Sequence, residues 1–518
     1  MSHFCGWTLD AIPRHNAARF PDRAAVICRG SRLSWRELDQ RVDRVAGALA
    51  AVGLKPGDRV ALLLSNCSEF IELYFGISRA GMIAVPINYR LTPRETATIL
   101  GSSRPELLVV GQAYQATALA LEELMPTLRR RWVVGGPADS YAETLALAPP
   151  PIPPAGNEDD PFAIFFTSGT TGLPKGAVVS HRNLEANAFN QCIADASRPS
   201  DINLVASPLY HMGAVFMATT YMLLGCTQVI LPQFDPPAWF QAVEGEGATV
   251  SLLIPTMINS LLNHAELGAR DLSRLRLIFY GGGPMPPALL RRALQQLGCG
   301  FTQGYGLTET LEATFLTASD HVLDGSETQL RRLASAGREA AGAEVRIVDL
   351  AGQDLPANEI GEILVRSHSV ISGYWNNPEE TAAAIRDGWF YTGDLGYLDE
   401  DRYLFLVDRK KDMVVSGGVN IYTKEIEAVL YAHPAVLEAA VIALPDEEWG
   451  EVVTAVVVLR PGMTMSAEQV IGHCTEQLAS FKKPRVVHFV DELPKNPSGK
   501  ILKRDLRDLF RGSSPAVS

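Results

Sequence analysis

The segment 165–181, FFTSGTTGLPKGAVVSH, places small hydroxyl residues, glycines and one lysine between two apolar stretches. Glycine lets backbone N–H groups approach an anion closely, and hydroxyl and ammonium groups also bind phosphate. A Walker A loop requires G-x-x-x-x-G-K-[ST], but Lys175 is followed by Gly176, so that pattern fails. Taken alone, the segment predicts an anion site, and a plain solvated turn stays open as the alternative.

Five further motifs follow in order: YGGGP (280–284), QGYGLTET (303–310), YTGDLG (391–396), DRKKDMVVSGGVNIYTKEIE (408–427) and PKNPSGKILKR (494–504). Together with the opening segment they resemble the adenylate-forming superfamily of acyl-CoA synthetases, free-standing adenylation domains and luciferase-like enzymes. The resemblance spans nearly the whole chain. It implies an acid–CoA ligase that uses ATP, Mg²⁺ and CoA. Such an enzyme converts a carboxylic acid to acyl-AMP with release of pyrophosphate, and then transfers the acyl group to the CoA thiol.

The resemblance also assigns residues to ATP. The β- and γ-phosphates would be wrapped by Thr167, Ser168, Gly169, Thr170, Thr171, Gly172 and Lys175. The adenine side would be formed by Gly281, Gly282 and Gly283 and by the nucleotide motif residues Gln303, Gly304, Tyr305, Gly306 and Thr308, with Tyr305 stacked on the base and Thr308 at the α-phosphate. Asp394 would accept hydrogen bonds from the ribose hydroxyls, and Arg409 would add a second ribose contact.

The metal and the first half-reaction depend on few side chains. The resemblance implies that Glu309 binds Mg²⁺ with Thr167 nearby, and Mg²⁺ prefers hard oxygen ligands and one or two carboxylates. The alternative for Glu309 is a surface glutamate at a helix start, stabilised by the helix dipole. Lys500, in a Ser-Gly loop, would bridge the substrate carboxylate and the α-phosphate, and an ordinary exposed lysine is its alternative.

The residues expected to serve the second half-reaction lie in the C-terminal part of the chain. In the superfamily a small C-terminal domain rotates after adenylation, and its hinge position corresponds to Lys411 here. Ser416, Gly417 and Gly418 would then line the tunnel for the pantetheine arm of CoA. One departure is Thr423, where the family usually has proline; a small loss of loop rigidity is the expected consequence.

The resemblance to the family implies that the acid is held by segments 209–217, 254–260, 280–284 and 303–314. His211 matches an aromatic or histidine gate beside the carboxylate, although a lone histidine among apolar residues is often a core residue. The pocket side chains are largely apolar, which suits an aliphatic or aromatic acid: Tyr210, Met212, Val215, Phe216, Met257 and Leu311. Glu312 is the odd residue, and a helix-surface carboxylate is favoured for it over a contact with a polar or cationic substrate.

The elements that must position these residues follow an α/β pattern. Ser34 and Glu37 have capping-box spacing before an apolar helical face that runs to Val52, and 58–65 reads as a buried strand. Helix, glycine turn and apolar strand recur, which favours largely parallel sheets covered by helices. From about residue 335 shorter strands predict a small barrel-like subdomain. We place an N-terminal domain at 1–408 and a mobile α+β C-terminal domain at 409–518.

Composition limits the classes of partner and the cellular compartment that we expect for this protein. The 518 residues are 47% hydrophobic and 20% charged, and the net charge of −12 disfavours nucleic acid as a partner. Seven scattered cysteines without a CxxC pair suit a reducing cytoplasm rather than a disulfide frame or zinc site. The chain has no apolar run long enough for a membrane span and no secretory signal. Whether it forms a homodimer is left open.

Two other functions remain at this stage. A free-standing adenylation enzyme that loads a carrier-protein phosphopantetheine would use the same residues. A non-catalytic acyl- or nucleotide-binding relative is disfavoured, because Glu309, Asp394 and Lys500 are all intact.

Overall fold

The computed structural model describes residues 8–126, 128, 130–137, 139–149, 156–167, 174–283, 285–495 and 501–511. The chain divides into two compact units. Unit 1 comprises residues 1–345 and 365–391, and unit 2 comprises residues 346–364 and 392–518. The division follows the contacts within each unit. It does not test whether a mobile domain begins at residue 409, which stays a prediction.

The larger sheet of unit 1 has nine strands in the order β15-β14-β13-β12-β11-β9-β10-β1-β2. The run from β13 to β1 is parallel, and the edges are antiparallel. Its strands are β1 (Ala24–Cys28), β2 (Ser31–Ser34), β9 (Ile202–Val205), β10 (Thr227–Ile230), β11 (Val250–Leu253), β12 (Leu277–Tyr280), β13 (Gly300–Leu307), β14 (Leu311–Leu316) and β15 (Arg338–Glu339).

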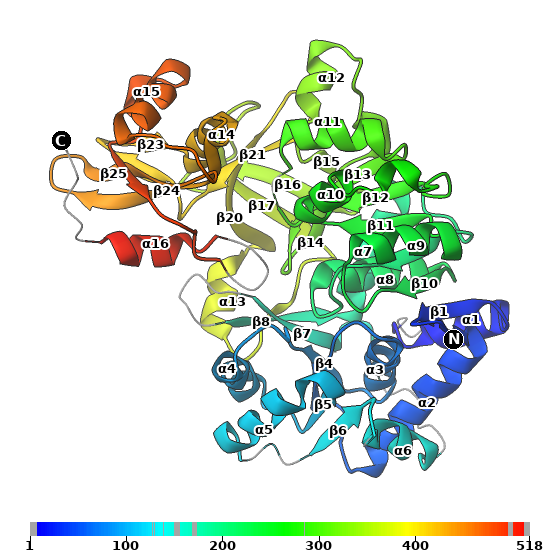
Figure 1. Ribbon diagram of the computed structural model, residues 1–518. Helices are drawn as coiled ribbons and strands as arrows, with labels where there is room; N and C mark the ends of the chain where they lie inside the picture. The colour runs from blue at the N-terminus through cyan, green and yellow to red at the C-terminus, as the bar shows by residue number, and fades with distance from the viewer. Residues whose placement is uncertain are drawn as a thin grey trace. The chain divides into compact units, whose positions relative to one another are not determined.

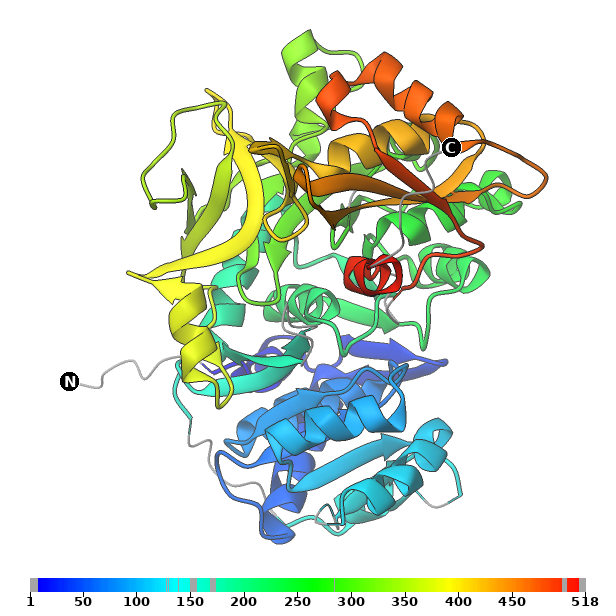
Figure 2. The ribbon, with the colours of Figure 1, turned by 90° about the vertical axis from the view of Figure 1, so that its left-hand side faces the viewer.

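The second sheet of unit 1 has seven strands in the order β18-β8-β7-β4-β3-β5-β6, with β7 to β6 parallel. Its strands are β3 (Arg59–Leu63), β4 (Ile83–Pro86), β5 (Leu107–Gly111), β6 (Arg131–Val134), β7 (Pro161–Thr167), β8 (Lys175–Ser180) and β18 (Gly373–Tyr374). Val60 and Leu62 belong to one buried cluster with helices α2 and α3, whereas Ala61 and Leu63 belong to another with α4 and α5. The period of two along β3 therefore places this strand between two helical layers. Figure 1 shows the same layering at the neighbouring strands β4 and β5, with α4 and α5 on one side and α2 and α3 on the other, and Figure 2 shows this part of the chain in blue and cyan from another side.

The helices of unit 1 form where the sequence supplies caps and apolar faces. Ser34 and Glu37 form the predicted capping box at the start of α2. The predicted helix–glycine–strand repeats are found as α3–β4, α8–β10 and α11–β13. The helices are α1 (Ala11–Arg19), α2 (Trp35–Ala51), α3 (Ser68–Arg79), α4 (Pro93–Ser103), α5 (Gln115–Leu124), α6 (Ser140–Ala146), α7 (His181–Ala194), α8 (Met212–Leu223), α9 (Pro236–Glu246), α10 (Pro255–Leu262), α11 (Pro287–Gln296), α12 (Glu327–Arg332) and α13 (Pro378–Ala384).

Two smaller sheets follow along the chain. The expectation of shorter strands after residue 335 is wrong, because the longest strands of this part have 10 and 11 residues. The first has the order β16-β17-β20-β19, with β21 also paired to β20. Its strands are β16 (Ala343–Val348), β17 (Gly361–Ser367), β19 (Ile385–Arg386), β20 (Trp389–Leu398) and β21 (Leu404–Arg409). The second lies in unit 2, in the order β23-β22-β25-β24 with β26 on β25. It comprises β22 (Val414–Ser416), β23 (Val419–Ile421), β24 (Val436–Asp446), β25 (Gly450–Leu459) and β26 (Val486–Phe489), with helices α14 (Thr423–Ala432), α15 (Ala467–Gln477) and α16 (Lys503–Phe510).

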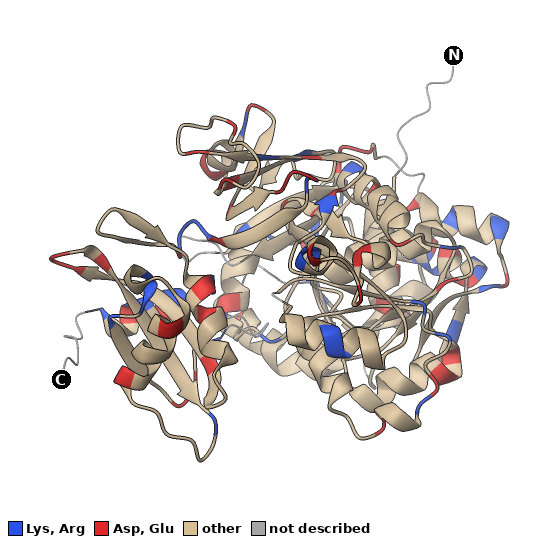
Figure 3. Ribbon diagram, turned by 90° about the horizontal axis from the view of Figure 1, so that it is seen from above, with Lys and Arg blue, Asp and Glu red and all other residues tan. Residues whose placement is uncertain are grey.

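The surface carries both signs of charge. In the view of Figure 3 the Lys and Arg residues are interspersed with Asp and Glu on the ribbon rather than gathered in one basic stripe. Among the described residues, no helix combines the length and the apolar character that crossing a bilayer requires.

Candidate active site

The predicted phosphate segment is flanked by two strands that pair antiparallel. Thr167 ends β7, Lys175 begins β8, and the two residues lie opposite each other in the register. The segment between them therefore starts and returns at one point of the seven-stranded sheet. The predicted ligands Ser168, Gly169, Thr170, Thr171 and Gly172 lie outside the described residues, so their roles stay predictions.

Glu309 lies in the turn that joins β13 to β14, and the alternative of a helix start is wrong for this residue. Its Oε1 accepts a hydrogen bond from the Thr167 hydroxyl at 3.3 Å and another from the Tyr374 hydroxyl at 3.1 Å. Thr167 belongs to the seven-stranded sheet, and Glu309 follows a strand of the nine-stranded sheet. The two predicted metal ligands, 142 residues apart, are thus brought together where the two sheets meet.

Lys175 is mostly buried, with 12% of its side chain exposed, and its ammonium pairs with Glu380 at 2.5 Å. Its Nζ also lies 5.5 Å from the centre of the Tyr374 ring. The sequence predicted neither Tyr374 nor Glu380 as a site residue. Both come from the segment around α13, more than sixty residues beyond Glu309, and no motif marks them.

The predicted adenine-side residues lie at the carboxyl ends of neighbouring parallel strands. Gly281, Gly282 and Gly283 follow β12, while Gln303 to Gly306 lie within β13, towards its carboxyl end. Tyr305 is buried, and the Tyr280 hydroxyl donates to Gln303 Oε1 at 3.3 Å. Thr308 lies in the same turn as Glu309. Ligands of open α/β sheets bind outside the carboxyl ends of the strands, where these residues are found.

His211 is the N-cap residue of α8 and stays exposed, so the alternative of a core histidine does not hold. Its ring lies 4.5 Å from that of Tyr210. Although the side chain reaches solvent, the protein that surrounds it and the positive charge of Arg90 lower the pKa of the imidazole. The ring is therefore uncharged near neutral pH, which suits a gate better than a cationic group.

The two predicted ribose ligands belong to unit 2 and lie opposite each other on β20 and β21. Arg409 Nε contacts Asp394 Oδ1 at 2.9 Å, and the Asp394 N–H donates to the Thr392 hydroxyl at 3.0 Å. The Asp394 side chain is nearly buried. This pair holds the carboxylate in one orientation with a cation beside it.

The predicted hinge and CoA residues lie next to this pair in the chain. Lys411 is an exposed residue of the turn between β21 and β22, and its carbonyl accepts a hydrogen bond from Arg507 at 3.3 Å. Ser416 ends β22, and Gly417 and Gly418 form a two-residue hairpin loop to β23 with φ of 57° and 80°. A turn with both residues at positive φ favours glycine at each position. Lys500 lies outside the described residues.

Thr423 donates hydrogen bonds that a proline at this position could not donate. Its N–H and its hydroxyl both donate to Asp408 Oδ2, the hydroxyl at 2.8 Å, and Lys503 Nζ donates to the same hydroxyl at 2.8 Å. A proline could donate neither bond, because it lacks both the N–H and the hydroxyl. Thr423 links β21 to the first turns of α14 and α16 through these bonds, and the expected loss of rigidity stays a prediction.

Glu312 differs from its favoured interpretation. It lies on β14 and not on a helix, and only 9% of the residue is exposed. Burial, and secondarily the negative charge of Asp195, raise the pKa of its carboxyl to about 8. The interpretation of Glu312 as a helix-surface carboxylate is therefore wrong.

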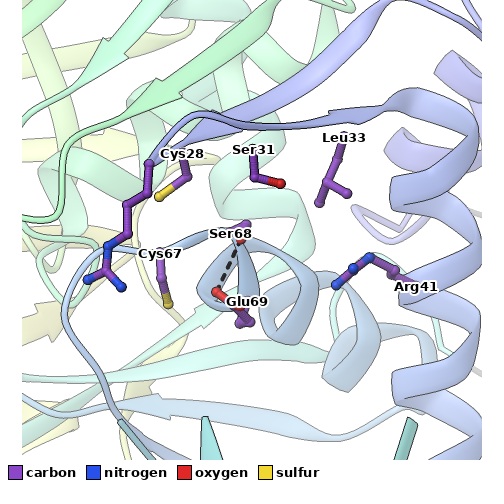
Figure 4. Close-up of a pocket in the computed structure, with 8 residues that line it drawn as sticks. Cys28, Ser31, Leu33, Arg41, Cys67, Ser68 and Glu69 are labelled. Atoms are coloured by element: carbon purple, nitrogen blue, oxygen red, sulfur yellow. Dashed lines mark hydrogen bonds between the residues drawn. The ribbon is translucent and has the colours of Figure 1, made fainter. Parts of the chain in front are cut away.

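A cavity of about 200 Å³ lies elsewhere in unit 1, between the β1–β2 hairpin and the start of α3 (Figure 4). In one wall of the cavity the Ser68 hydroxyl donates a hydrogen bond to the carboxylate of the next residue, Glu69, at 3.1 Å. None of the predicted site residues belongs to its lining, which consists of Cys28, Arg29, Ser31, Leu33, Arg41, Cys67, Ser68 and Glu69.

The residues at the meeting point of the two sheets fit Mg²⁺. Glu309 offers a partly buried carboxylate and Thr167 a hydroxyl within hydrogen-bond distance of it. Mg²⁺ is usually held by one or two carboxylates together with water and substrate phosphates rather than by an all-protein cage. Accordingly, the described residues contain no group of three or more His, Cys, Asp and Glu side chains that could enclose a metal ion.

The fold and the meeting of Thr167 with Glu309 between two α/β sheets suit a nucleotide-dependent enzyme. The model of the family described as "AMP-binding enzyme" matches residues 13–375, and that of the "AMP-binding enzyme C-terminal domain" matches residues 425–500. The chain belongs to this family of AMP-binding, adenylate-forming enzymes.

Similar proteins cover nearly the whole chain. A fatty acid–[acyl-carrier-protein] ligase, ScoC, from Streptomyces coeruleorubidus is 38% identical over 98% of this chain and 97% of its own. A feruloyl-CoA synthase from Amycolatopsis is 38% identical over 97% and 99%. The ATP-bound crystal structure of MatB from Rhodopseudomonas palustris superposes with a TM-score of 0.87 at 34% identity, covering 98% and 99%. The o-succinylbenzoate CoA synthetase MenE from Bacillus subtilis, in complex with its acyl-adenylate intermediate, gives 0.86 at 30% identity, covering 97% and 99%.

The chain is an AMP-forming acid–CoA ligase that uses ATP, Mg²⁺ and CoA. The predicted family, the predicted fold class and the predicted reaction are thereby confirmed.

Proposed function

We propose that Thr167, Lys175 and Glu309 hold the triphosphate and metal end of ATP in this ligase. The observation that carries the proposal is the contact between Thr167 and Glu309, with Lys175 directly across the strand pair. Bound Mg²⁺ would neutralise phosphate charge as the pyrophosphate leaves. Lys175 is paired with Glu380, so phosphate binding requires its ammonium to exchange a carboxylate partner for a phosphate.

The proposed reaction has two steps. A carboxylate oxygen of the acid bonds to the α-phosphorus, the bond to the β-phosphate oxygen breaks, and pyrophosphate leaves with that electron pair. The CoA thiolate then bonds to the acyl carbon, the carbon–oxygen bond to AMP breaks, and AMP leaves. We assign charge stabilisation in the first step to Lys500, ribose binding to Asp394 and Arg409, and the pantetheine path to Ser416, Gly417 and Gly418.

The experiment for the metal assignment is acid-dependent ATP–pyrophosphate exchange in a Glu309→Gln variant. Removal of the carboxylate charge should lower the exchange rate by about a hundredfold or more. Glu359→Gln, at an exposed position outside the site, is the matched control and should exchange like the wild type. A Glu309→Gln rate within a few fold of the control would remove Glu309 from the metal site.

The acid itself is proposed to be an apolar aliphatic or aromatic one. Tyr210, Met212, Val215 and Phe216 are buried at the start of α8, and Leu311 is buried at the start of β14. An apolar lining of this kind suits a hydrocarbon chain or ring. A broad panel of acids, read by AMP release with CoA present, tests the assignment; activity confined to small dicarboxylic acids would contradict it.

The alternative acceptor has one observation in its favour, since a similar protein is named as an acyl-carrier-protein ligase. Parallel assays with CoA and with a phosphopantetheinylated carrier protein compare the two acceptors. We expect CoA to be the better substrate in kcat/KM.

We make two further proposals, one about the cellular compartment and one about the oligomeric state. The six cysteines in the described part of the chain are free thiols, which supports a reducing compartment such as the cytoplasm. A homodimer is tested by sedimentation velocity of the purified chain.

A further inference from the structure

A buried carboxylate lies three residues after Glu309, beside the segments proposed to hold the acid. Glu312 is on β14, and one of its oxygens, Oε2, is buried with no hydrogen-bond partner among the described residues. Burying a polar group without a partner destabilises the folded protein. Such groups are rare in native structures, and each one calls for a specific explanation.

The carboxylate occupies the space above Gly304 on the neighbouring strand β13. A Cβ at Gly304 would overlap Glu312 Oε2 and the ring edge of Phe279, so only glycine leaves room for both side chains. The Phe279 ring lies 5.8 Å from Phe216 on α8 and 6.4 Å from Phe315 on β14. Two of the segments proposed for the acid, α8 and β14, therefore approach one aromatic group that has the Glu312 carboxylate at its edge.

The polar surroundings do not supply the missing donor to Oε2. Asn187 on α7 uses its Oδ1 to accept the Glu312 backbone N–H at 3.0 Å, and its own Nδ2 is also buried without a partner. The charge that acts on the Glu312 carboxyl is negative: it is that of Asp195, whose Oδ2 accepts from Gln191 at 2.6 Å and from Tyr221 at 3.2 Å. A carboxylate kept for folding alone would be expected to have a donor or cation beside it.

We propose that Glu312 binds the acyl portion of the substrate, and that the acid carries a hydrogen-bond donor, a hydroxyl or a protonated amine, on an otherwise apolar body. The proposal rests on the acid-activating function proposed above and on the same acyl segments. The aromatic rings Phe216 and Phe279 would contact the apolar body. The raised pKa leaves the Glu312 carboxyl protonated near neutral pH in the empty site, so a hydroxyl would donate to its carbonyl oxygen, whereas the positive charge of an amine would favour the ionised carboxylate. Glu312 is thus a specificity-determining residue of this chain.

The test compares acids that differ only by the donor. The matched probes are p-hydroxycinnamate against cinnamate, ω-hydroxydecanoate against decanoate, and ω-aminodecanoate against decanoate. The measurement is kcat and KM for AMP release by the full-length enzyme with ATP, Mg²⁺ and CoA. For at least one pair the wild type should prefer the donor-bearing acid by about tenfold or more in kcat/KM, because a site built around a polar contact rejects the analogue that leaves it unpaired.

Two variants of Glu312 distinguish a hydroxyl donor on the acid from an amine donor. Glu312→Met keeps the length of the side chain and removes both oxygens, so the preference should fall to about one, mainly through KM. Glu312→Gln keeps an acceptor without charge, so a preference for a hydroxyl should persist and a preference for an amine should be lost. Glu123→Gln, an exposed glutamate of α5, is the control and should keep the wild-type ratios. Melting temperatures check that each variant is folded.

The outcomes are distinct. A wild type that adenylates acids but prefers the donor in none of the three pairs overturns the inference and leaves the proposed function intact. A preference that survives unchanged in Glu312→Met also overturns it, and if that variant does not fold, the wild-type ratios decide. If ATP binds but no acid in the panel is adenylated, the proposed function fails and this inference fails with it.

Discussion

One carboxylate oxygen of Glu309 accepts hydrogen bonds from two hydroxyl groups. The second donor, Tyr374, lies outside the sequence motifs, so the site includes a residue that the motifs do not mark. The Tyr374 hydroxyl donates to Oε1 at 3.1 Å, while burial, Glu309 and Glu380 keep the pKa of that phenol raised. The phenol therefore remains a donor at any working pH. Groups of this kind orient a metal-binding carboxylate without touching the metal.

Replacing Tyr374 by Phe should weaken Mg²⁺ use by about tenfold, because loss of an orienting hydrogen bond typically costs that much in metal affinity or activity. The measurement is the Mg²⁺ concentration for half-maximal ATP–pyrophosphate exchange. Tyr391→Phe is a matched control, since Tyr391 lies outside the Glu309 cluster and stacks with Arg386. An unchanged Mg²⁺ requirement in Tyr374→Phe would show that the hydroxyl has no part in metal binding.

The Glu312 carboxyl makes stability depend on pH. Burial raises its pKa from 4.5 to about 8 in the folded chain, so the native state retains a proton that the unfolded chain releases between those values. Its contribution is fully present below about pH 4.5 and is lost as the pH rises towards 8. Asp195, with its pKa raised to about 6 by burial, acts in the same direction at lower pH.

Glu312→Gln removes the titrating group while leaving Asp195 in place. Between pH 5.5 and pH 8 the variant should therefore lose less stability than the wild type, by an amount on the order of a few kcal/mol at one pKa unit per 1.4 kcal/mol. Calorimetric melting of both proteins at the two pH values gives the comparison. Equal shifts of the melting temperature in the two proteins would contradict a raised pKa at Glu312.

At the scale of elements, Asp408 and Thr423 tie the end of β21 to α14. The N-cap residue of α14, Tyr422, makes no capping bond with its side chain. Asp408, fifteen residues earlier in the chain, instead accepts the first N–H of the helix and the hydroxyl of the same residue, Thr423, and a negative charge at this end is also favoured by the helix dipole. Lys503 of α16 joins the same hydroxyl and pairs with Glu427 at 2.7 Å.

Thr423→Ala should lower the stability of unit 2 by about 1–3 kcal/mol, since it leaves a buried carboxylate and an ammonium each short of a partner. Thr423→Pro should cost at least as much, because it also removes the N–H donor. Amide hydrogen exchange of α14 reports the loss locally, and Thr464→Ala at an exposed position serves as the control. Protection of α14 that is the same in all three variants would show that the link does not stabilise the helix.

Local signals in the sequence were sufficient for many elements and insufficient for several contacts. The capping box at Ser34 and Glu37 and the strand within 58–65 follow from neighbouring residues, and both were found. The position of Glu312 was misread because antiparallel pairing of β13 with β14, a tertiary choice, decides between strand and helix there. Tyr374 and Glu380 could not be predicted, since their partners Glu309 and Lys175 are 65 and 205 residues away and no periodicity records such pairs.

At the scale of the whole molecule, the two units contain different parts of the proposed chemistry. Thr167, Lys175 and Glu309 belong to unit 1, and Asp394, Arg409 and Lys411 belong to unit 2. An enzyme with two half-reactions can use two arrangements of such units, one for each step. Lys411, exposed in the turn between β21 and β22, is where we expect the backbone to change.

Lys411→Pro should spare adenylation and impair thioester formation, because proline fixes φ at its own position and restricts the preceding residue. The two steps are measured separately, as ATP–pyrophosphate exchange and as acyl-CoA formation from supplied acyl-adenylate. Lys411→Ala, which removes the same ammonium and leaves the backbone free, is the matched control and should retain both steps. The complementary variant Lys500→Ala should lose adenylation by a factor of about a hundred or more and keep acyl transfer. If Lys411→Pro slowed both steps equally, or if the alanine control failed like the proline, a backbone hinge at this position would be ruled out.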